Sequence, residues 1–107
     1  MLHIDDLRML CTDDKIFLTQ HLQLRMHKRG ILYDDMVSAI ITGEIIEQYP
    51  ADYPYPSCLI MGTTVNGSYL HVVCGIGNGI LWIITTYYPT SSKWEDDNKT
   101  RKVENKL

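Results

Sequence analysis

The stretch SCLIMGTTVNGSYLHVVCGI, which spans residues 57–76, decides the fold of this chain. Two runs rich in apolar and β-branched residues flank the pair Asn66-Gly67 at its centre. An Asn-Gly pair between two such runs is the strongest short-range signal for a β-hairpin. The pattern therefore predicts strands over residues 57–65 and 68–76, joined by a two-residue turn.

The length of this turn determines which side chains share a face of the hairpin, because a shift of one residue moves every side chain of a strand to the other face. With a two-residue turn, Val65 pairs with Ser68, and His71 lies opposite Gly62. The glycine would leave open space beside the imidazole. The other face is apolar and is expected to carry the helices; its side chains are Leu59, Met61, Thr63, Leu70, Val72 and Cys74.

Outward from the hairpin, residues 44–49 and 80–88 also have the composition of strands, so the sequence predicts a four-stranded antiparallel meander. Before the meander, apolar residues recur every three or four positions, and Thr19 and Gly30 stand where a helix would begin and end. Short helices are expected over residues 4–11, 20–29 and 34–42, with an extended link at 16–18 and a C-terminal helix or tail from Lys93.

These elements predict one α+β domain, because 107 residues with 45% hydrophobic side chains suffice for one core. We expect the domain to span residues 1–107, with the helices on one face of the sheet. Its core is expected over about residues 16–94, followed by a basic polar tail over about 98–107.

Formal charges are distributed unevenly along the chain, whose net charge is −3. Residues 1–52 carry nine acidic and five basic side chains, whereas residues 53–92 carry neither. An uncharged stretch of this length suggests a membrane span, but its prolines, its Asn-Gly pair and its histidine favour a buried sheet, and we expect no membrane partner. Charged groups for chemistry must therefore come from the flanking segments.

The three cysteines, Cys11, Cys58 and Cys74, are odd in number and have no CxxC spacing. This arrangement argues against a disulfide scaffold and a zinc site, and it predicts free thiols in a reducing, cytoplasmic location. The acidic residues that follow Met1 differ from the basic start of a signal peptide. We accordingly expect no bound metal and no cofactor.

One candidate site is a positive stripe on the second predicted helix. His21, Arg25 and Arg29 stand four residues apart and share one side of that helix, and Lys28 adds to its positive edge. Such a stripe suits a phosphodiester, because arginine grips it with two donors and histidine moves a proton near neutral pH. The alternative is a solvated helix face, although residues 20–30 contain no acidic side chain.

A second candidate is His71, which faces a tyrosine of the adjacent strand: Tyr88 if the turn at residues 77–79 has two residues, or Tyr87 if it has three. The alternative is a half-buried strand histidine that is bonded to a hydroxyl. Tyr55 belongs to a stiff segment rich in tyrosine and proline, which suits either stacking on a base or covering the sheet edge.

Several strings of this chain resemble one small family of bacterial domains of unknown function. The strings are TQH (19–21), RMHKRGI (25–31), GEII (43–46), DYPYPSCL (52–59), LHVV (70–73), ITTYYP (84–89) and KW (93–94). Members are often encoded beside YgiT-type zinc-finger proteins, the antitoxin type that partners a RelE-like toxin. The resemblance, which runs from about Ile16 to Trp94, therefore implies a RelE/barnase-like fold and a toxin–antitoxin setting.

The resemblance and the residues together predict a metal-independent endoribonuclease. In such enzymes a base takes the 2′-hydroxyl proton, cations hold the phosphate and an acid protonates the leaving oxygen. The alternative is a non-catalytic domain that binds RNA or a protein partner such as the zinc-finger antitoxin, and the oligomeric state stays open. The expected RNA contacts are Arg25, Arg29, Lys28 and Tyr55, and the expected proton-transfer groups are His71, His21, Tyr87 and Tyr88.

Overall fold

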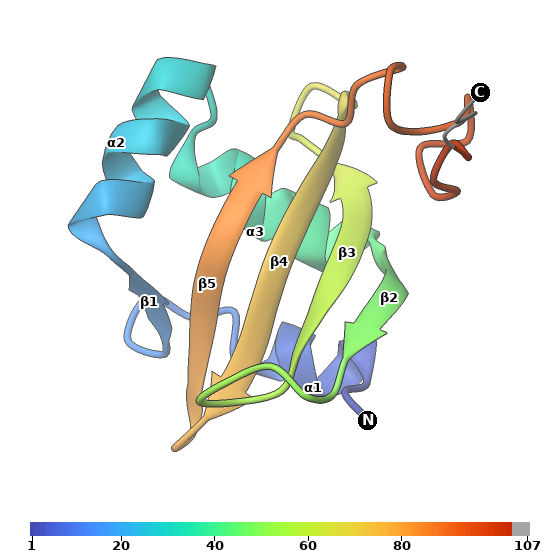
Figure 1. The fold of residues 1–107 in the computed structure, drawn as a ribbon. Helices are drawn as coiled ribbons and strands as arrows, with labels where there is room; N and C mark the ends of the chain where they lie inside the picture. The colour runs from blue at the N-terminus through green and yellow to red at the C-terminus, as the bar shows by residue number, and fades with distance from the viewer. Residues whose placement is uncertain (104–107) are drawn as a thin grey trace.

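A five-stranded mixed sheet forms the centre of the computed structural model, which describes residues 1–103 (Figure 1). The strands are β1 (Ile16–Leu18), β2 (Glu44–Tyr49), β3 (Ser57–Thr63), β4 (Tyr69–Gly77) and β5 (Ile80–Tyr87), arranged in the order β1-β5-β4-β3-β2. The helices of the described residues are α1 (Ile4–Met9), α2 (Gln20–Arg29) and α3 (Tyr33–Thr42). The fold is therefore α+β.

The main core lies between the helices and one face of the sheet. Leu22 and Met26 of α2 and Met36 and Ile40 of α3 pack in a single buried cluster with side chains of β3, β4 and β5. The sheet contributes Cys58, Ile60, Leu70, Val72, Cys74, Leu81 and Ile83. We call this the helix face and the opposite side the second face.

The local signals for α2 act as the sequence predicts, and α3 begins at a buried carboxylate. The Thr19 hydroxyl accepts the N–H of Leu22 at 3.0 Å, and Gly30 ends α2 in the left-handed conformation with φ of 69°. The buried carboxylate of Asp35 accepts the N–H groups of Leu32 and Val65, both at 3.2 Å. Asp35 therefore ties the start of α3 to the hairpin loop.

The hairpin of β3 and β4 has a three-residue loop, so the predicted two-residue turn is wrong. Thr64 N–H donates to the carbonyl of Ser68 at 2.8 Å, and the Thr64 hydroxyl accepts the N–H of Ser68 at 3.1 Å. Gly67 takes a left-handed conformation with φ of 85°, as expected where a type I turn is followed by a bulge. His71 consequently pairs with Met61 rather than Gly62.

The one-residue shift also exchanges the faces of β3. Leu59, Met61 and Thr63 were expected beneath the helices, but they share the second face with His71, while β4 presents Leu70, Val72 and Cys74 to the helices as predicted. Gly62 lies on the helix face instead of beside the imidazole. A Cβ atom on Gly62 would stand only 1.9 Å from the carbonyl oxygen of Ala39, so the glycine allows α3 to approach the sheet closely.

Two further expectations are corrected at the ends of the sheet. The predicted link Ile16–Leu18 is the strand β1, which pairs in parallel with β5, so the sheet is neither four-stranded nor wholly antiparallel. A three-residue strand shows too little alternation to be recognised, and its partner stands more than sixty residues away. The described part of the C-terminal segment forms turns and an isolated bridge between Trp94 and Arg101 rather than a helix.

Residues 93–101 fold back onto the second face, and we call them the C-terminal strap (Figure 1). Residues 98–101 of the expected basic tail therefore belong to the folded structure, while residues 104–107 lie outside the described residues. None of the helices within residues 1–103 is long and apolar enough to cross a membrane.

The substitution Gly62→Ala tests the close packing of α3 on β3. The added methyl group meets backbone atoms of Ala39, which cannot move without shifting the helix. We expect the free energy of unfolding to fall by about 1–3 kcal/mol or more, measured by thermal or urea denaturation. Val65→Ala in the exposed hairpin loop serves as the control. An unchanged stability of Gly62→Ala would contradict the observed register.

Candidate functional site

The second face of the sheet is covered at its two ends by different segments. Residues 50–56 cross the end that contains the β4–β5 turn, and the strap covers the end that contains His71 (Figure 1). A two-residue turn at Asn78-Gly79 and a bulge at Ile84 together set the register of β5. As a result, Trp82 and Tyr87 both lie on the second face with His71. A two-residue turn had been expected to place Trp82 there with Tyr88, and a three-residue turn to place Tyr87 there without Trp82.

His71 is fully buried beneath the strap. The Trp94 ring stands edge-on to the imidazole with 4.5 Å between ring centroids. The Nε2 atom lies 2.6 Å from the carbonyl oxygen of Asn98, and the Nδ1 atom lies 3.4 Å from the hydroxyl of Tyr87. Because a carbonyl only accepts, Nε2 carries the proton, and Nδ1 is then the acceptor for the Tyr87 hydroxyl.

Burial sets the protonation states of this pair. It lowers the pKa of His71 below the usual 6.5, and Arg101 acts in the same direction, while the Asn98 carbonyl and Glu47 oppose the shift. Burial also raises the pKa of Tyr87 above the usual 10.0. At pH 7 the pair therefore consists of a neutral imidazole and a protonated phenol.

Two ion pairs attach the strap to β2. Arg101 binds the carboxylate of Glu47 with two donors, at 2.8 Å and 3.0 Å, and its guanidinium lies 4.7 Å from the centre of the Trp94 ring. The same hydrogen bonds hold the pKa of Glu47 below its usual value. The ammonium of Lys99 contacts the Glu44 carboxylate at 2.7 Å. These contacts fix Trp94 over His71.

A cavity of about 420 Å³ opens between the end of α2, the end of β5 and the strap. We call it the basic cleft; its lining residues are Arg29, Tyr87, Tyr88, Thr90, Lys93, Trp94 and Arg101. Arg29 is held there because its Nη1 donates to the carbonyl of Thr86 at 2.8 Å. Strand β1 pairs with β5 only as far as Ile83, so this carbonyl lies on a strand edge that the helix end can reach.

The cations of the basic cleft differ in their pairing. Arg101 is neutralised by Glu47, but within residues 1–103 no carboxylate lies within ion-pair distance of Arg29 or Lys93. Two cations without a carboxylate partner and two tyrosines therefore line one cavity. This arrangement can hold an anion and offer it hydrogen bonds.

The structure brings together part of the predicted site. Arg29, Tyr87 and Tyr88 line the basic cleft, and His71 lies behind Tyr87. His21, Arg25 and Lys28 are exposed on α2 and are not among the residues that line this cleft, and Tyr55 lies at the other end of the sheet. Sequence reasoning missed Lys93 and Arg101 as site residues, although the resemblance included the pair Lys93-Trp94.

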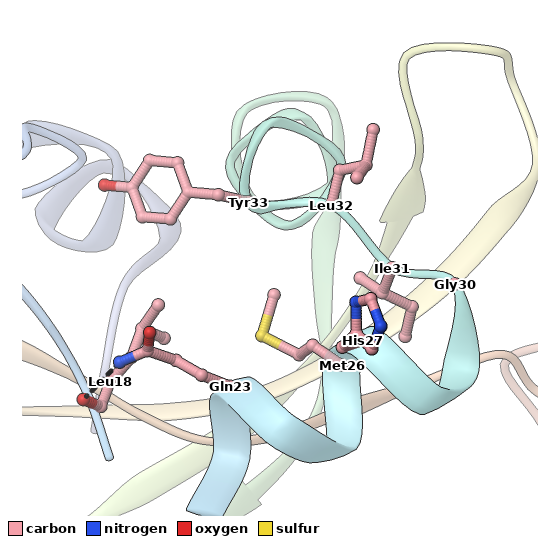
Figure 2. A pocket seen from close by; sticks show the side chains of 8 residues that line it. All are labelled: Leu18, Gln23, Met26, His27, Gly30, Ile31, Leu32 and Tyr33. Atoms are coloured by element: carbon pink, nitrogen blue, oxygen red, sulfur yellow. Dashed lines mark hydrogen bonds between the residues drawn. The ribbon is translucent and has the colours of Figure 1, made fainter. Parts of the chain in front are cut away.

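A second cavity, of about 470 Å³, lies between α2 and α3 (Figure 2). Its walls are mainly apolar, with Met26 and Ile31 between the helices and the exposed side chain of Leu32 at the rim. The Tyr33 hydroxyl is occupied because it donates to Asp13 at 3.1 Å. This cavity lacks the combination of free cations and hydroxyls found in the basic cleft.

Comparison with known proteins gives one match. Residues 18–88 match a protein family described as Domain of unknown function (DUF4258). No curated protein and no solved structure matches the chain, so the expected RelE-like relationship stays a prediction.

The buried histidine predicts a pH dependence of stability. Because the pKa of His71 is lower in the folded chain, the unfolded chain takes up the proton first as the pH falls below about 6.5, and stability is lost. We expect the melting temperature to fall between pH 7.5 and pH 5.5, and to fall less in His71→Gln. His27→Gln, at an exposed position, is the control. An equal fall of the melting temperature in wild type and in His71→Gln would show that this histidine does not titrate as described.

Proposed function

The chain belongs to the DUF4258 family, and we propose that it binds RNA in the basic cleft and cleaves it as a metal-independent endoribonuclease, the toxin of a toxin–antitoxin pair. One observation carries the proposal: two cations without a carboxylate partner share a cleft with a tyrosine that is hydrogen-bonded to a buried histidine. The toxin setting and a zinc-finger antitoxin as partner are supported by the sequence resemblance alone.

Arg29 and Lys93 would hold the phosphate. Nη1 of Arg29 donates to the Thr86 carbonyl at 2.8 Å and to the Thr85 hydroxyl at 3.4 Å, which orients the guanidinium and leaves its Nε and Nη2 donors for a ligand. Lys93 of the strap is exposed, lines the same cleft and adds a second positive charge. A phosphodiester between them would receive charge-assisted hydrogen bonds, which are stronger than neutral ones.

Tyr87 and His71 would supply the proton transfer. The phenol oxygen of Tyr87 would accept the proton of the ribose 2′-hydroxyl while its own proton passes to Nδ1 of His71. Burial disfavours the imidazolium so formed, and the carbonyl of Asn98 and Glu47, which act to raise the pKa of His71, partly offset this cost. The 2′-oxygen attacks the phosphorus, and Tyr88 or Lys93 would protonate the leaving 5′-oxygen.

The burial of His71 favours a second candidate function. The imidazole has no exposed surface, so it acts on RNA only through Tyr87. If Tyr87 fails to transfer protons, the same cleft serves a non-catalytic domain that binds RNA without cutting it. The two functions share the anion site and differ in the fate of the RNA.

Cleavage assays separate the two candidates. We expect the purified protein to cleave RNA in the presence of EDTA, and Tyr87→Phe to reduce the rate about 10²–10⁴-fold because a proton-transfer group is lost. Binding of an uncleavable 2′-O-methyl RNA should persist in this variant, since the cations remain. Tyr69→Phe removes a hydroxyl from a half-exposed tyrosine of β4 that lines neither this cleft nor its neighbour on β5, and it should leave the rate unchanged.

Intact RNA across pH 5 to 8 with wild-type protein would reject the ribonuclease and leave the binding domain. Equal rates for wild type and Tyr87→Phe would reject the assigned proton-transfer pair.

A further inference from the structure

A second cleft lies on the same face of the sheet, at the end opposite the strap. It is a cavity of about 500 Å³ between β1, β5 and residues 52–55, and we call it the aromatic cleft. Its larger side chains are Phe17, Tyr53, Pro54, Tyr55, Trp82 and Ile84. Phe17 and Ile84 are each about half exposed, so the cleft is open to solvent.

The rings of the aromatic cleft are held in fixed positions. Tyr55 lies directly over Gly77, where a Cβ atom would come within 2.3 Å of the ring, and its hydroxyl accepts a hydrogen bond from Asn78 at 3.2 Å. The indole N–H of Trp82 donates to the carbonyl of Gly77 at 2.9 Å. Phe17 contacts Trp82 with 4.9 Å between ring centroids. Because the polar atoms of these rings are engaged, the rings offer apolar faces to a ligand.

The charge of the aromatic cleft excludes an anionic ligand. Of its lining residues within the described chain, Asp52 alone carries a formal charge, and its carboxylate accepts the hydroxyl of Ser57 at 2.6 Å. Without a cation, the cleft has nothing to neutralise a phosphate. A flat, uncharged group with an apolar face fits it better, and in RNA this group is the base.

The two clefts lie along one strand. Trp82 and Tyr87 are on the same face of β5 because the bulge at Ile84 adds one residue between them. Five residues of strand span about 16 Å. The surface between them includes Thr85 and Val73, which are paired, partly exposed and uncharged. A single nucleic-acid strand can therefore follow β5 between the two clefts without passing a carboxylate of that strand.

We propose that the aromatic cleft is a base-stacking subsite for single-stranded RNA whose phosphates occupy the basic cleft. This inference rests on the proposed RNA-binding function. Only an unpaired base presents a free face to Phe17 and Trp82, so the substrate is single-stranded. Stacking tolerates every base, and the polar atoms of Tyr55 and Trp82 are already bonded. The subsite therefore reads the presence of a base more than its identity.

Two uncleavable oligomers test the subsite by fluorescence anisotropy. One is a 2′-O-methyl RNA of eight nucleotides, and the other has the same backbone without bases. We expect Phe17→Ala to weaken binding of the first about 5- to 150-fold, the range measured for one stacked base, and to leave the second unchanged. Tyr69→Ala, at a half-exposed tyrosine far from the cleft on β4, should bind both oligomers as wild type does.

A further variant separates this inference from the proposed function. Arg29→Ala should weaken the binding of both oligomers and reduce the salt dependence of that binding, because a phosphate contact is lost. If Arg29→Ala weakens binding but Phe17→Ala binds both oligomers as wild type does, the stacking subsite is refuted and the basic cleft stands. If wild type binds neither oligomer, both proposals fail. Should Phe17→Ala not fold, Phe17→Leu removes the ring while keeping apolar bulk, with the same expected results.

Discussion

The register of the β3–β4 hairpin determines what stands on each side of the sheet. The hydrogen bond from Thr64 N–H to Ser68 closes a three-residue loop, and every later pair along the two strands follows from it. Gly62 consequently meets Ala39 of α3, where no side chain fits, and His71 faces away from the helices. A slip of one residue would place Met61 against α3 and remove the close approach of helix and sheet.

The strap completes the side that the helices leave uncovered. Trp94 and the Asn98 carbonyl enclose His71, and Arg101 anchors the segment to Glu47. This enclosure keeps the imidazole neutral and leaves Tyr87 as its link to the basic cleft. The chemistry that we propose for the cleft therefore depends on a segment far from His71 in sequence.

Local signals made much of the fold predictable. The Thr19 cap, the Gly30 stop and the Asn-Gly turn located α2 and the hairpin because each depends on neighbouring residues. Three features were not predicted from the sequence. Strand β1 was missed because its parallel partner is distant in the chain. The length of the hairpin loop, which depends on the Thr64 hydroxyl, and the bulge at Ile84 were missed as well. The period-two alternation of strand residues contains no information about a bulge. The sequence therefore did not determine on which face of the sheet Tyr87 lies. Within the site, Arg29 and Tyr87 were predicted because arginine and tyrosine suit phosphate binding and proton transfer. Lys93 reaches the same cleft only because the strap folds back onto the sheet.

The most direct measurement is an NMR titration of isotopically labelled protein with an uncleavable 2′-O-methyl RNA. We expect the chemical-shift changes to concentrate on the backbone amides of Arg29, Tyr87 and Lys93 and on the indole N–H of Trp94, because these residues line the basic cleft. Changes confined to the groove of Met26 and Leu32 between α2 and α3, or no changes at all, would contradict it.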